Sequence, residues 1–220
     1  MTIKLENLNK SYGKKPVLFD INLEIPTGSF TMLRGVSGSG KSTFLNIIGG
    51  IEPMTSGQVL IDDYDVSKLK GGERADFYRH KIGFIFQGFY LQPQLTIGEN
   101  IALMGTFAGM PKKEREARVK ELAEMLGIAE VLDSLPAEVS GGQAERACAA
   151  RAMFMHPEII LADEPTNNLD PENARNVIEM LKKIQQDTGA TMIVASHDPM
   201  VERFATQVIS IKEGRTFLVN

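Results

Sequence analysis

The sequence predicts an α/β fold with three parts: a core with a mainly parallel sheet, an N-terminal antiparallel β subdomain and an inserted α-helical subdomain. Three observations predict this fold. Continuous apolar segments at 159–162 and 191–195 alternate with helical patterns, as parallel strands buried on both faces do. Residues 19–25 alternate strictly between apolar and polar, which is typical of a half-buried antiparallel strand. Strand signals vanish between residues 88 and 157.

The first part of the chain reads as β structure that leads into a helix. Apolar segments bounded by turn residues predict strands at residues 3–8, 19–25, 30–33, 58–61 and 82–86. The strand at 30–33 runs into a glycine-rich loop. From Lys41 the pattern becomes helical, and its apolar side carries Phe44, Leu45, Ile47 and Ile48.

The remainder predicts the helical insert and the return to the α/β pattern. We expect Pro111 at the first position of a long helix, and a second helix after Ser140. The inner face of the long helix carries Val119, Leu122, Met125 and Leu126. Strands follow at 159–162, 191–195 and 208–211. Pro171 begins a helix whose apolar face holds Val177, Ile178, Leu181 and Ile184.

These elements predict a single domain over residues 1–220. Its nucleotide-binding core and β subdomain take residues 1–87 and 158–220, and the helical subdomain takes 88–157. The chain ends soon after its last strands, so we expect no regulatory tail domain.

Composition excludes several classes of protein. The formal net charge of −4 argues against a nucleic-acid binder, and no nucleic-acid partner is expected. The single cysteine, Cys148, forms no internal disulfide and reads as a small buried apolar residue. Neither a signal-peptide core nor ~18 consecutive apolar residues occurs. We therefore expect a cytoplasmic protein that reaches a membrane only through a partner.

A phosphate-binding motif follows the strand at 30–33. It matches the pattern G-x-x-x-x-G-K-[ST] in full: Gly35, Val36, Ser37, Gly38, Ser39, Gly40, Lys41 and Ser42. Glycines let successive backbone N–H groups point at phosphate oxygens, and the following helix adds its positive end. Lys41 would neutralise the β- and γ-phosphates, Ser42 would ligate Mg²⁺, and Thr43 would reach the α-phosphate. The motif predicts a P-loop NTPase.

Two acids and a histidine follow the buried strands beyond it. Asp163 and Glu164 end the strand at 159–162, where adjacent buried carboxylates need a cation. Asp163 would hold Mg²⁺, and Glu164 would polarise the attacking water as general base. His197 lies just beyond the strand at 191–195, where a γ-phosphate sensor would be placed.

A further motif narrows the class. Ser140, Gly141, Gly142 and Gln143, 20 residues before Asp163, resemble the signature motif of ABC ATPases, and the resemblance covers essentially the whole chain. It implies an ATP- and Mg²⁺-dependent ATPase that works as a homodimer with a transmembrane permease. In such a dimer, Ser140, Gly142 and Gln143 would serve the nucleotide bound by the opposite subunit.

The same resemblance assigns other positions. Tyr12 is similar to the aromatic residue that stacks on adenine, and Gln87 to the glutamine that touches Mg²⁺ and senses the permease. Residues 168–170 resemble the D-loop, and His197 the H-loop histidine. The chain departs from the family pattern at Val139, at residues 144–146 and at Asn167. The departures at 144–146 and Asn167 put the turnover rate in doubt rather than ATP binding.

The sub-family that the chain most resembles is the lipoprotein-releasing and macrolide-exporter type. The supporting segments are 45–50, 82–87, 95–100 and 161–170. This resemblance implies a subunit, peripheral on the inner face of the membrane, that drives export or the extraction of lipoproteins, peptides or drugs. A non-transporting complex, in which the same dimer pushes a signalling or mechanotransmitting membrane partner, remains the alternative. A DNA- or ribosome-associated protein of the same class is disfavoured by the acidic balance.

Overall fold

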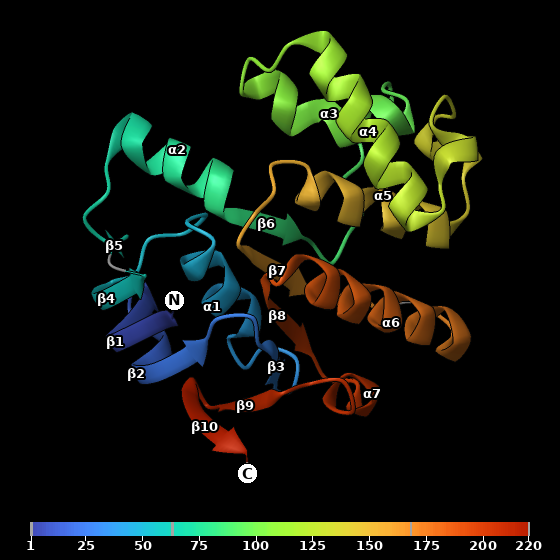
Figure 1. Ribbon diagram of the computed structural model, residues 1–220. Coiled ribbons are helices and arrows are strands. Elements are labelled where there is room, and N and C mark those ends of the chain that lie inside the picture. Colours follow the sequence, from blue (N-terminus) through green and yellow to red (C-terminus); the bar gives the residue numbers. More distant parts are fainter. Residues whose placement is uncertain (1, 63, 168, 220) are drawn as a thin grey trace.

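Two sheets organise the computed structural model, which describes residues 2–62, 64–167 and 169–219 (Figure 1). The smaller sheet is antiparallel, has the order β2-β1-β4-β5, and comprises β1 (Thr2–Tyr12), β2 (Lys15–Pro26), β4 (Ser56–Ile61) and β5 (Tyr64–Asp65). The larger sheet has the order β10-β9-β3-β8-β7-β6. Its strands are β3 (Phe30–Arg34), β6 (Ile82–Ile85), β7 (Ile159–Asp163), β8 (Thr191–Ser196), β9 (Gln207–Lys212) and β10 (Arg215–Val219).

The larger sheet is parallel except at one edge. The neighbouring pairs from β9 through β3, β8 and β7 to β6 are all parallel, whereas β10 pairs with β9 in the antiparallel sense. Every residue of β7 and β8 is buried, as expected for central strands covered on both faces. The predicted α/β fold, with its antiparallel β subdomain, is confirmed.

Alternate residues of the central strands feed two hydrophobic cores. Ile159 and Leu161 join the core shared with α1 (Lys41–Ile48) and the antiparallel sheet. Ile160 and Ala162 join the core on the opposite face, against α6 (Pro171–Thr188) and the helical subdomain. This period of two follows from strand geometry, and it fixes the carboxyl end of β7 between the two layers.

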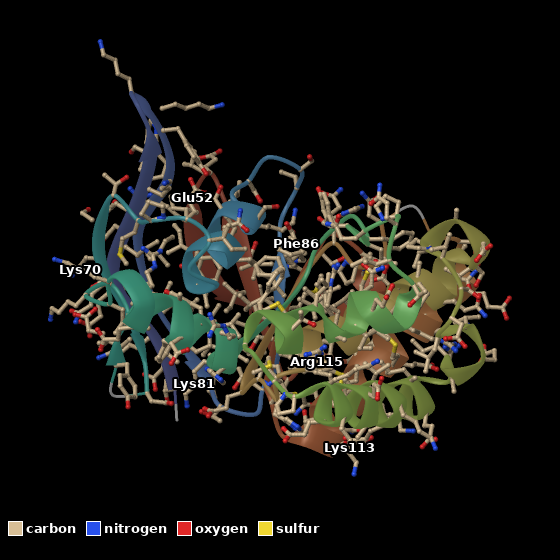
Figure 2. All side chains as sticks on the ribbon, turned by 90° about the horizontal axis from the view of Figure 1, so that it is seen from above. Glu52, Lys70, Lys81, Phe86, Lys113 and Arg115 are labelled. Carbon is tan, nitrogen blue, oxygen red and sulfur yellow. The ribbon has the colours of Figure 1, made fainter. Side chains whose placement is uncertain are left out.

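The helical subdomain is inserted between β6 and β7. Its helices are α3 (Ile97–Phe107), α4 (Lys112–Leu126), α5 (Gly141–Met153) and the 3₁₀ turns η1 (Ala129–Val131) and η2 (Pro136–Glu138). Figure 2 shows this lobe, marked by Lys113 and Arg115, set to one side of the β lobe that carries Lys70. Thr96 begins α3 with a capping box in which its hydroxyl accepts from the Glu99 amide. The predicted helical insert is thereby confirmed.

Several details differ from the sequence prediction. Pro111 is the N-cap of α4 and not its first residue, because the helix begins one residue later. Met125 is 40% exposed, and Ala123 is buried in the helix face instead. The strand predicted to end at Phe86 ends at Ile85, and it is only partly buried because β6 is an edge strand of its sheet.

Several elements were not expected individually from the sequence. The helix α2 (Gly71–Lys81) has no buried residue and thus no strong apolar stripe. The helix α3, the short β5 and the C-terminal β10 were not named either, and Phe217 and Leu218 on β10 are both more than half exposed. A short helix, α7 (Pro199–Glu202), follows β8. In the described part of the chain, no helix is both long and apolar enough to cross a membrane.

Candidate functional site

The loop at residues 35–40 joins the end of β3 to α1, and its backbone needs glycine at several points. Gly38 and Gly40 have φ angles of 77° and 106°, in the left-handed region that other residues rarely adopt. A Cβ atom on Gly35 would lie 2.7 Å from the carbonyl oxygen of Ile211. The sequence therefore folds here into a tight curl that leads into the N-terminus of α1.

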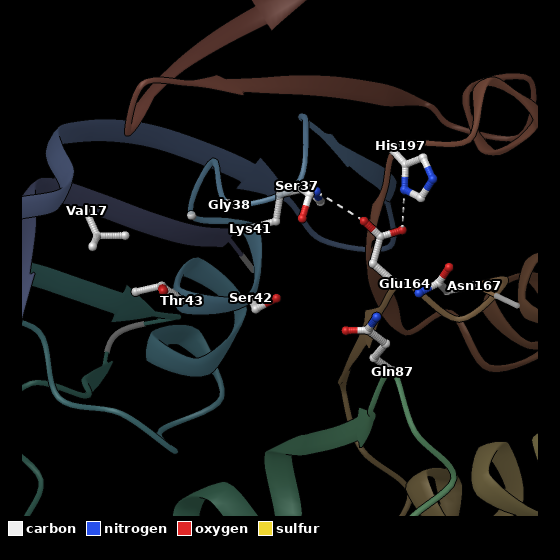
Figure 3. A pocket seen from close by; sticks show the side chains of 11 residues that line it. Val17, Ser37, Gly38, Lys41, Ser42, Thr43, Gln87, Glu164, Asn167 and His197 are labelled. Atoms are coloured by element: carbon white, nitrogen blue, oxygen red, sulfur yellow. Dashed lines mark hydrogen bonds and ion pairs between the residues drawn. The ribbon is translucent and has the colours of Figure 1, made fainter.

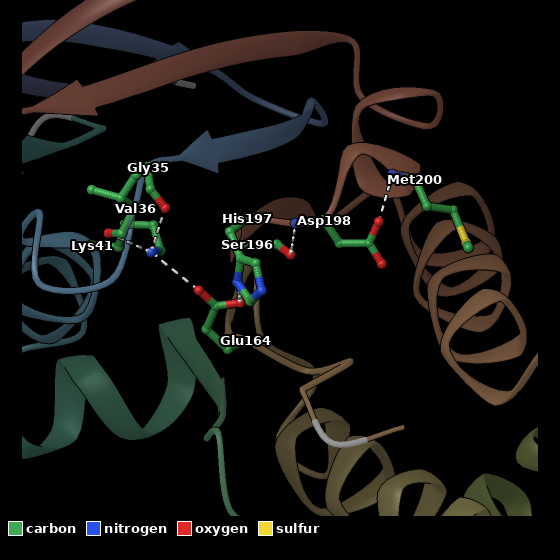
Figure 4. Close-up of polar contacts among 8 residues, drawn as sticks. All are labelled: Gly35, Val36, Lys41, Glu164, Ser196, His197, Asp198 and Met200. Atoms are coloured by element: carbon green, nitrogen blue, oxygen red, sulfur yellow. Dashed lines mark hydrogen bonds and ion pairs between the residues drawn. The ribbon is translucent and has the colours of Figure 1, made fainter. Parts of the chain in front are cut away.

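Lys41, the first residue of α1, is buried and turned back over this loop. Its ammonium donates to the carbonyl oxygens of Gly35 (2.8 Å) and Val36 (3.2 Å). The same ammonium lies 3.1 Å from Oε1 of Glu164 (Figure 4). A buried cation is stable only when it is paired and hydrogen-bonded, and these three contacts meet that requirement.

The end of β7 brings two carboxylates to the loop. Glu164 has a φ of 47°, and its amide donates to the Ala195 carbonyl at the end of β8. Asp163 is 8% exposed, and its Oδ1 has no hydrogen-bond partner. Burial raises the pKa of Asp163, a shift that Ser42 and Lys41 partly oppose and that Glu164 reinforces. The strained turn at Glu164 aims its side chain across the loop and towards the neighbouring strand.

His197, one residue beyond β8, lies against the other side of the Glu164 carboxylate. Its Nδ1 lies 2.9 Å from Oε2 of Glu164, while most of the imidazole is exposed. Figure 3 shows Lys41 and His197 on the two sides of the Glu164 carboxylate. The predicted base and the predicted sensor are therefore in direct contact.

A pocket of about 250 Å³ opens beside these residues (Figure 3). It is lined by the predicted residues Ser37, Gly38, Gly40, Lys41, Ser42, Thr43, Gln87, Glu164 and His197, together with Val17 and Asn167. Val17 was missed because nothing in its local sequence marks it, and only the packing of β2 against the loop brings it here. The site thus unites segments that are up to 180 residues apart.

Several predicted residues lie outside this pocket. Gly35 and Val36 accept hydrogen bonds from Lys41 through their carbonyls, and Ser39 is buried within the loop. Tyr12 contacts Glu52 through its hydroxyl. Asn168, in the predicted D-loop, lies outside the described residues.

The signature residues lie at the start of α5, in the helical subdomain. Ser140 is the N-cap: its hydroxyl accepts from the Gln143 amide (3.3 Å), and its own amide donates to Oε1 of Gln143. Ser140 and Gly141 are exposed, and none of residues 140–143 lines the pocket beside Lys41. These residues form a separate, outward-facing helix N-terminus.

The site suits a magnesium ion that takes few ligands from the protein. Among residues 2–62, 64–167 and 169–219, no three His, Cys, Asp or Glu side chains gather as a metal-binding group. Mg²⁺ usually takes one or two carboxylates and completes its shell with phosphates and water. The unpartnered Oδ1 of Asp163, with Ser42 nearby, fits that donor set.

The fold and this site define a phosphate-loop nucleotide-binding protein with an inserted helical lobe. The family described as "ABC transporter" matches residues 18–167, and the chain belongs to that family. It is 38% identical to a bacitracin export ATP-binding protein of Halalkalibacterium halodurans, over 98% of this chain and 87% of the relative. It is 42% identical to a macrolide export ATP-binding/permease protein of Campylobacter jejuni, over 96% of this chain.

The chain spans 33% of the length of that macrolide exporter relative. A solved structure described as a dimeric bacterial ABC transporter cassette superposes with a TM-score of 0.89 and 38% identity, covering 99% of both chains. A post-hydrolysis dimeric cassette bound to ADP and phosphate gives a TM-score of 0.88. The chain is an ATP-binding and ATP-hydrolysing cassette of an ABC transporter, and its predicted resemblance to macrolide exporters is confirmed.

Proposed function

We propose that two copies of this chain close on ATP as a homodimer and drive a transmembrane permease of the export or extraction type. The observation that carries the proposal is the separation of the signature residues 140–143 from the pocket beside Lys41. Each copy carries both a phosphate loop and an exposed helix N-terminus. At each site of the dimer, one copy would supply the phosphate loop and the other copy the helix N-terminus. The dimeric cassettes among the solved relatives and the relatives named for bacitracin and macrolide export support it.

Within each site, the chain's residues divide the work between binding and catalysis. Lys41 and the amides of residues 35–43 bind the phosphates. Ser42, Gln87 and Asp163 would hold Mg²⁺, which would neutralise charge on the phosphates. Glu164 accepts a proton from the attacking water, and His197 orients Glu164 through the contact at 2.9 Å and faces the γ-phosphate.

The remaining roles depend on the second copy. Tyr12 would stack on adenine of its own nucleotide, whereas Ser140, Gly142 and Gln143 would close the γ-phosphate side of the partner's nucleotide. Closure excludes water and fixes hydrogen-bond donors around the transferred group. The helical subdomain at residues 88–157 is proposed as the unit that carries this closing surface, with the core at 1–87 and 158–220.

The chain is proposed to lie on the inner face of the cell membrane, held there by its permease. Fractionation of the native cells tests this location and this partner. We expect the chain in the membrane fraction, where a crosslinker joins it to a protein with membrane-spanning segments. Recovery only in the supernatant, without such a crosslink, would contradict the proposal.

A further inference from the structure

Tyr12 is tied to two charged residues. Its hydroxyl donates to Oε2 of Glu52 at 2.5 Å, and the ammonium of Lys10 lies 2.8 Å from Oε1 of the same carboxylate. Lys10 also donates to the carbonyl oxygen of Pro53 (2.7 Å) and lies over the Tyr12 ring, 4.7 Å from its centroid. The ring thus has its hydroxyl fixed and one face covered by a cation.

Glu52 in turn belongs to the segment that leaves the phosphate-loop helix α1. Its amide and that of Ile51 both donate to the carbonyl oxygen of Asn46, within α1. Figure 2 shows Glu52 on the side of the molecule where α1 meets the β lobe. The carboxylate therefore connects the ring at the end of β1 to the helix that carries Lys41 and Ser42.

The charges of the cluster favour this arrangement. The Glu52 and Lys10 side chains are largely buried, so their attraction is little screened by water. Burial acts to raise the pKa of Glu52, but the hydrogen bonds from Lys10 and Tyr12 outweigh burial and hold it below its ordinary value. Burial raises the pKa of the Tyr12 hydroxyl and the bond to Glu52 raises it further, which together outweigh the opposing effects of Thr43 and Lys10, so the hydroxyl stays a donor at neutral pH.

Tyr12 needs such a support because it is 47% exposed at the end of a strand. A free ring would sample several rotamers, and a ligand would have to order it on binding. A ring fixed beforehand offers its open face to a base without that cost, and stacking contributes about 1–3 kcal/mol per base.

We propose that Glu52, with Lys10, is the positioning residue that holds the Tyr12 ring in register with the phosphate loop and so sets the affinity for the base of the nucleotide. This inference rests on the proposed stacking of Tyr12. Glu52 does not line the pocket beside Lys41 and would act on the base through Tyr12, so its effect on the base can be compared with its effect on the phosphates.

Titration calorimetry with ATP and with inorganic tripolyphosphate, which has no base, tests the proposal. Glu52→Ala and Tyr12→Phe should each weaken ATP binding roughly three- to ten-fold, the value of one internal hydrogen bond. Tripolyphosphate binding should be unchanged. The double variant should be no weaker than the weaker single variant, because both remove the same bond. Glu52→Gln keeps an accepting oxygen and should bind ATP more tightly than Glu52→Ala.

Steady-state kinetics supply a second readout. KM for ATP should rise while kcat at saturating ATP stays unchanged, since the phosphate chemistry is untouched. Glu6→Ala, which breaks the exposed Lys4–Glu6 pair on the same strand, serves as the control and should alter neither constant. If Glu52→Ala does not fold, Tyr12→Phe, which deletes one oxygen at a half-exposed position, carries the test alone.

The opposing outcomes are separable. Equal weakening of ATP and tripolyphosphate in Glu52→Ala, or independent effects that multiply in the double variant, would overturn the positioning role. If Tyr12→Ala weakens ATP binding while Glu52→Ala and Tyr12→Phe match the wild type, only this inference fails. If Tyr12→Ala itself leaves ATP affinity unchanged, the stacking role assigned to Tyr12 fails.

Discussion

Glu164 Oε1 lies 3.1 Å from the ammonium of Lys41, and this contact joins the end of β7 to the start of α1. The other oxygen of the same carboxylate faces Nδ1 of His197. Three residues from three separate segments thus meet at one carboxylate. Because Glu164 stands between the other two, changes at each position should have different consequences.

Glu164→Gln should abolish turnover while ATP still binds. The amide keeps the shape of the side chain but cannot accept a proton, and loss of a general base costs roughly 10²- to 10⁴-fold in rate. A phosphate-release assay measures the rate, and size exclusion in ATP should show the accumulated dimer. Glu158→Gln, at the residue that immediately precedes β7, is the matched control and should keep its activity. Near wild-type hydrolysis by Glu164→Gln would show that another group is the base.

Lys41→Ala should abolish tight ATP binding. The change removes the main side-chain countercharge of a desolvated triphosphate, which is worth roughly 3 kcal/mol or about 100-fold in affinity. It also leaves Glu164 without its cationic neighbour. Titration with a fluorescent ATP analogue measures the loss, and the exposed Lys68→Ala variant provides the control. Unchanged affinity would remove Lys41 from the phosphate site.

The sequence predicted helices and strands wherever their buried residues form a regular apolar pattern. β7 and β8 are buried on both faces and read as apolar runs. Four of the six buried residues of α6 were identified, and the small Ala174 and the polar Gln185 were not. The helix α2 escaped prediction because it has no buried residue. The strand β10 also escaped prediction. It lies at the edge of its sheet and exposes Phe217, so its apolar residues do not alternate with polar ones in the pattern of a half-buried strand.

The site was predictable where a motif fixes the backbone or ends a buried strand. The phosphate loop, Gln87, Glu164 and His197 all reach one pocket. The sequence does not predict which side chains from distant segments contact one another. The Glu164–His197 contact and the approach of Val17 depend on how β7, β8 and β2 pack. The signature residues 140–143 lie apart from this pocket, at the start of α5.

Glu145→Gln should stabilise the protein at alkaline pH. Glu145 is 6% exposed on α5, and burial raises its pKa to about 7 from an ordinary value of 4.5. The folded state therefore binds more protons, and the stability that this proton provides is complete below pH ~4.5 and lost as pH rises through about 7. Removing the carboxylate should recover up to about 3 kcal/mol at pH 8, or roughly 5–10 °C in Tm.

Thermal unfolding of both proteins at pH 5 and pH 8 checks this expectation. The gain in Tm should be larger at pH 8 than at pH 5, where the wild-type carboxyl is already mostly protonated. Glu124→Gln, on the exposed face of α4, is the control and should show no such pH dependence. A gain that is equal at both pH values would mean that Glu145 is not protonated in the folded protein.

Ser140→Arg should block dimerisation and hydrolysis while each monomer still binds ATP. Ser140 is exposed at the N-terminus of α5, and residues 140–143 do not line the pocket beside Lys41. Bulk and charge at this position would therefore obstruct a surface that meets another copy and leave the phosphate loop of its own copy intact. ATP titration of the monomer and size exclusion in ATP measure the two effects separately.

Mixing the two inactive variants decides which nucleotide the signature residues serve. In a two-fold symmetric dimer, the phosphate loop of Ser140→Arg would face the intact signature residues of Lys41→Ala, and one composite site would be whole. Mixed dimers should have at most this one intact site, because the second site lacks both Lys41 and Ser140, so any activity of the mixture should not exceed about half of the wild-type rate per dimer. Neither variant alone should hydrolyse ATP. Loss of ATP binding by the Ser140→Arg monomer would instead mean that the signature residues serve the nucleotide of their own copy. A monomer has no second subunit, so such a loss must arise within its own nucleotide site.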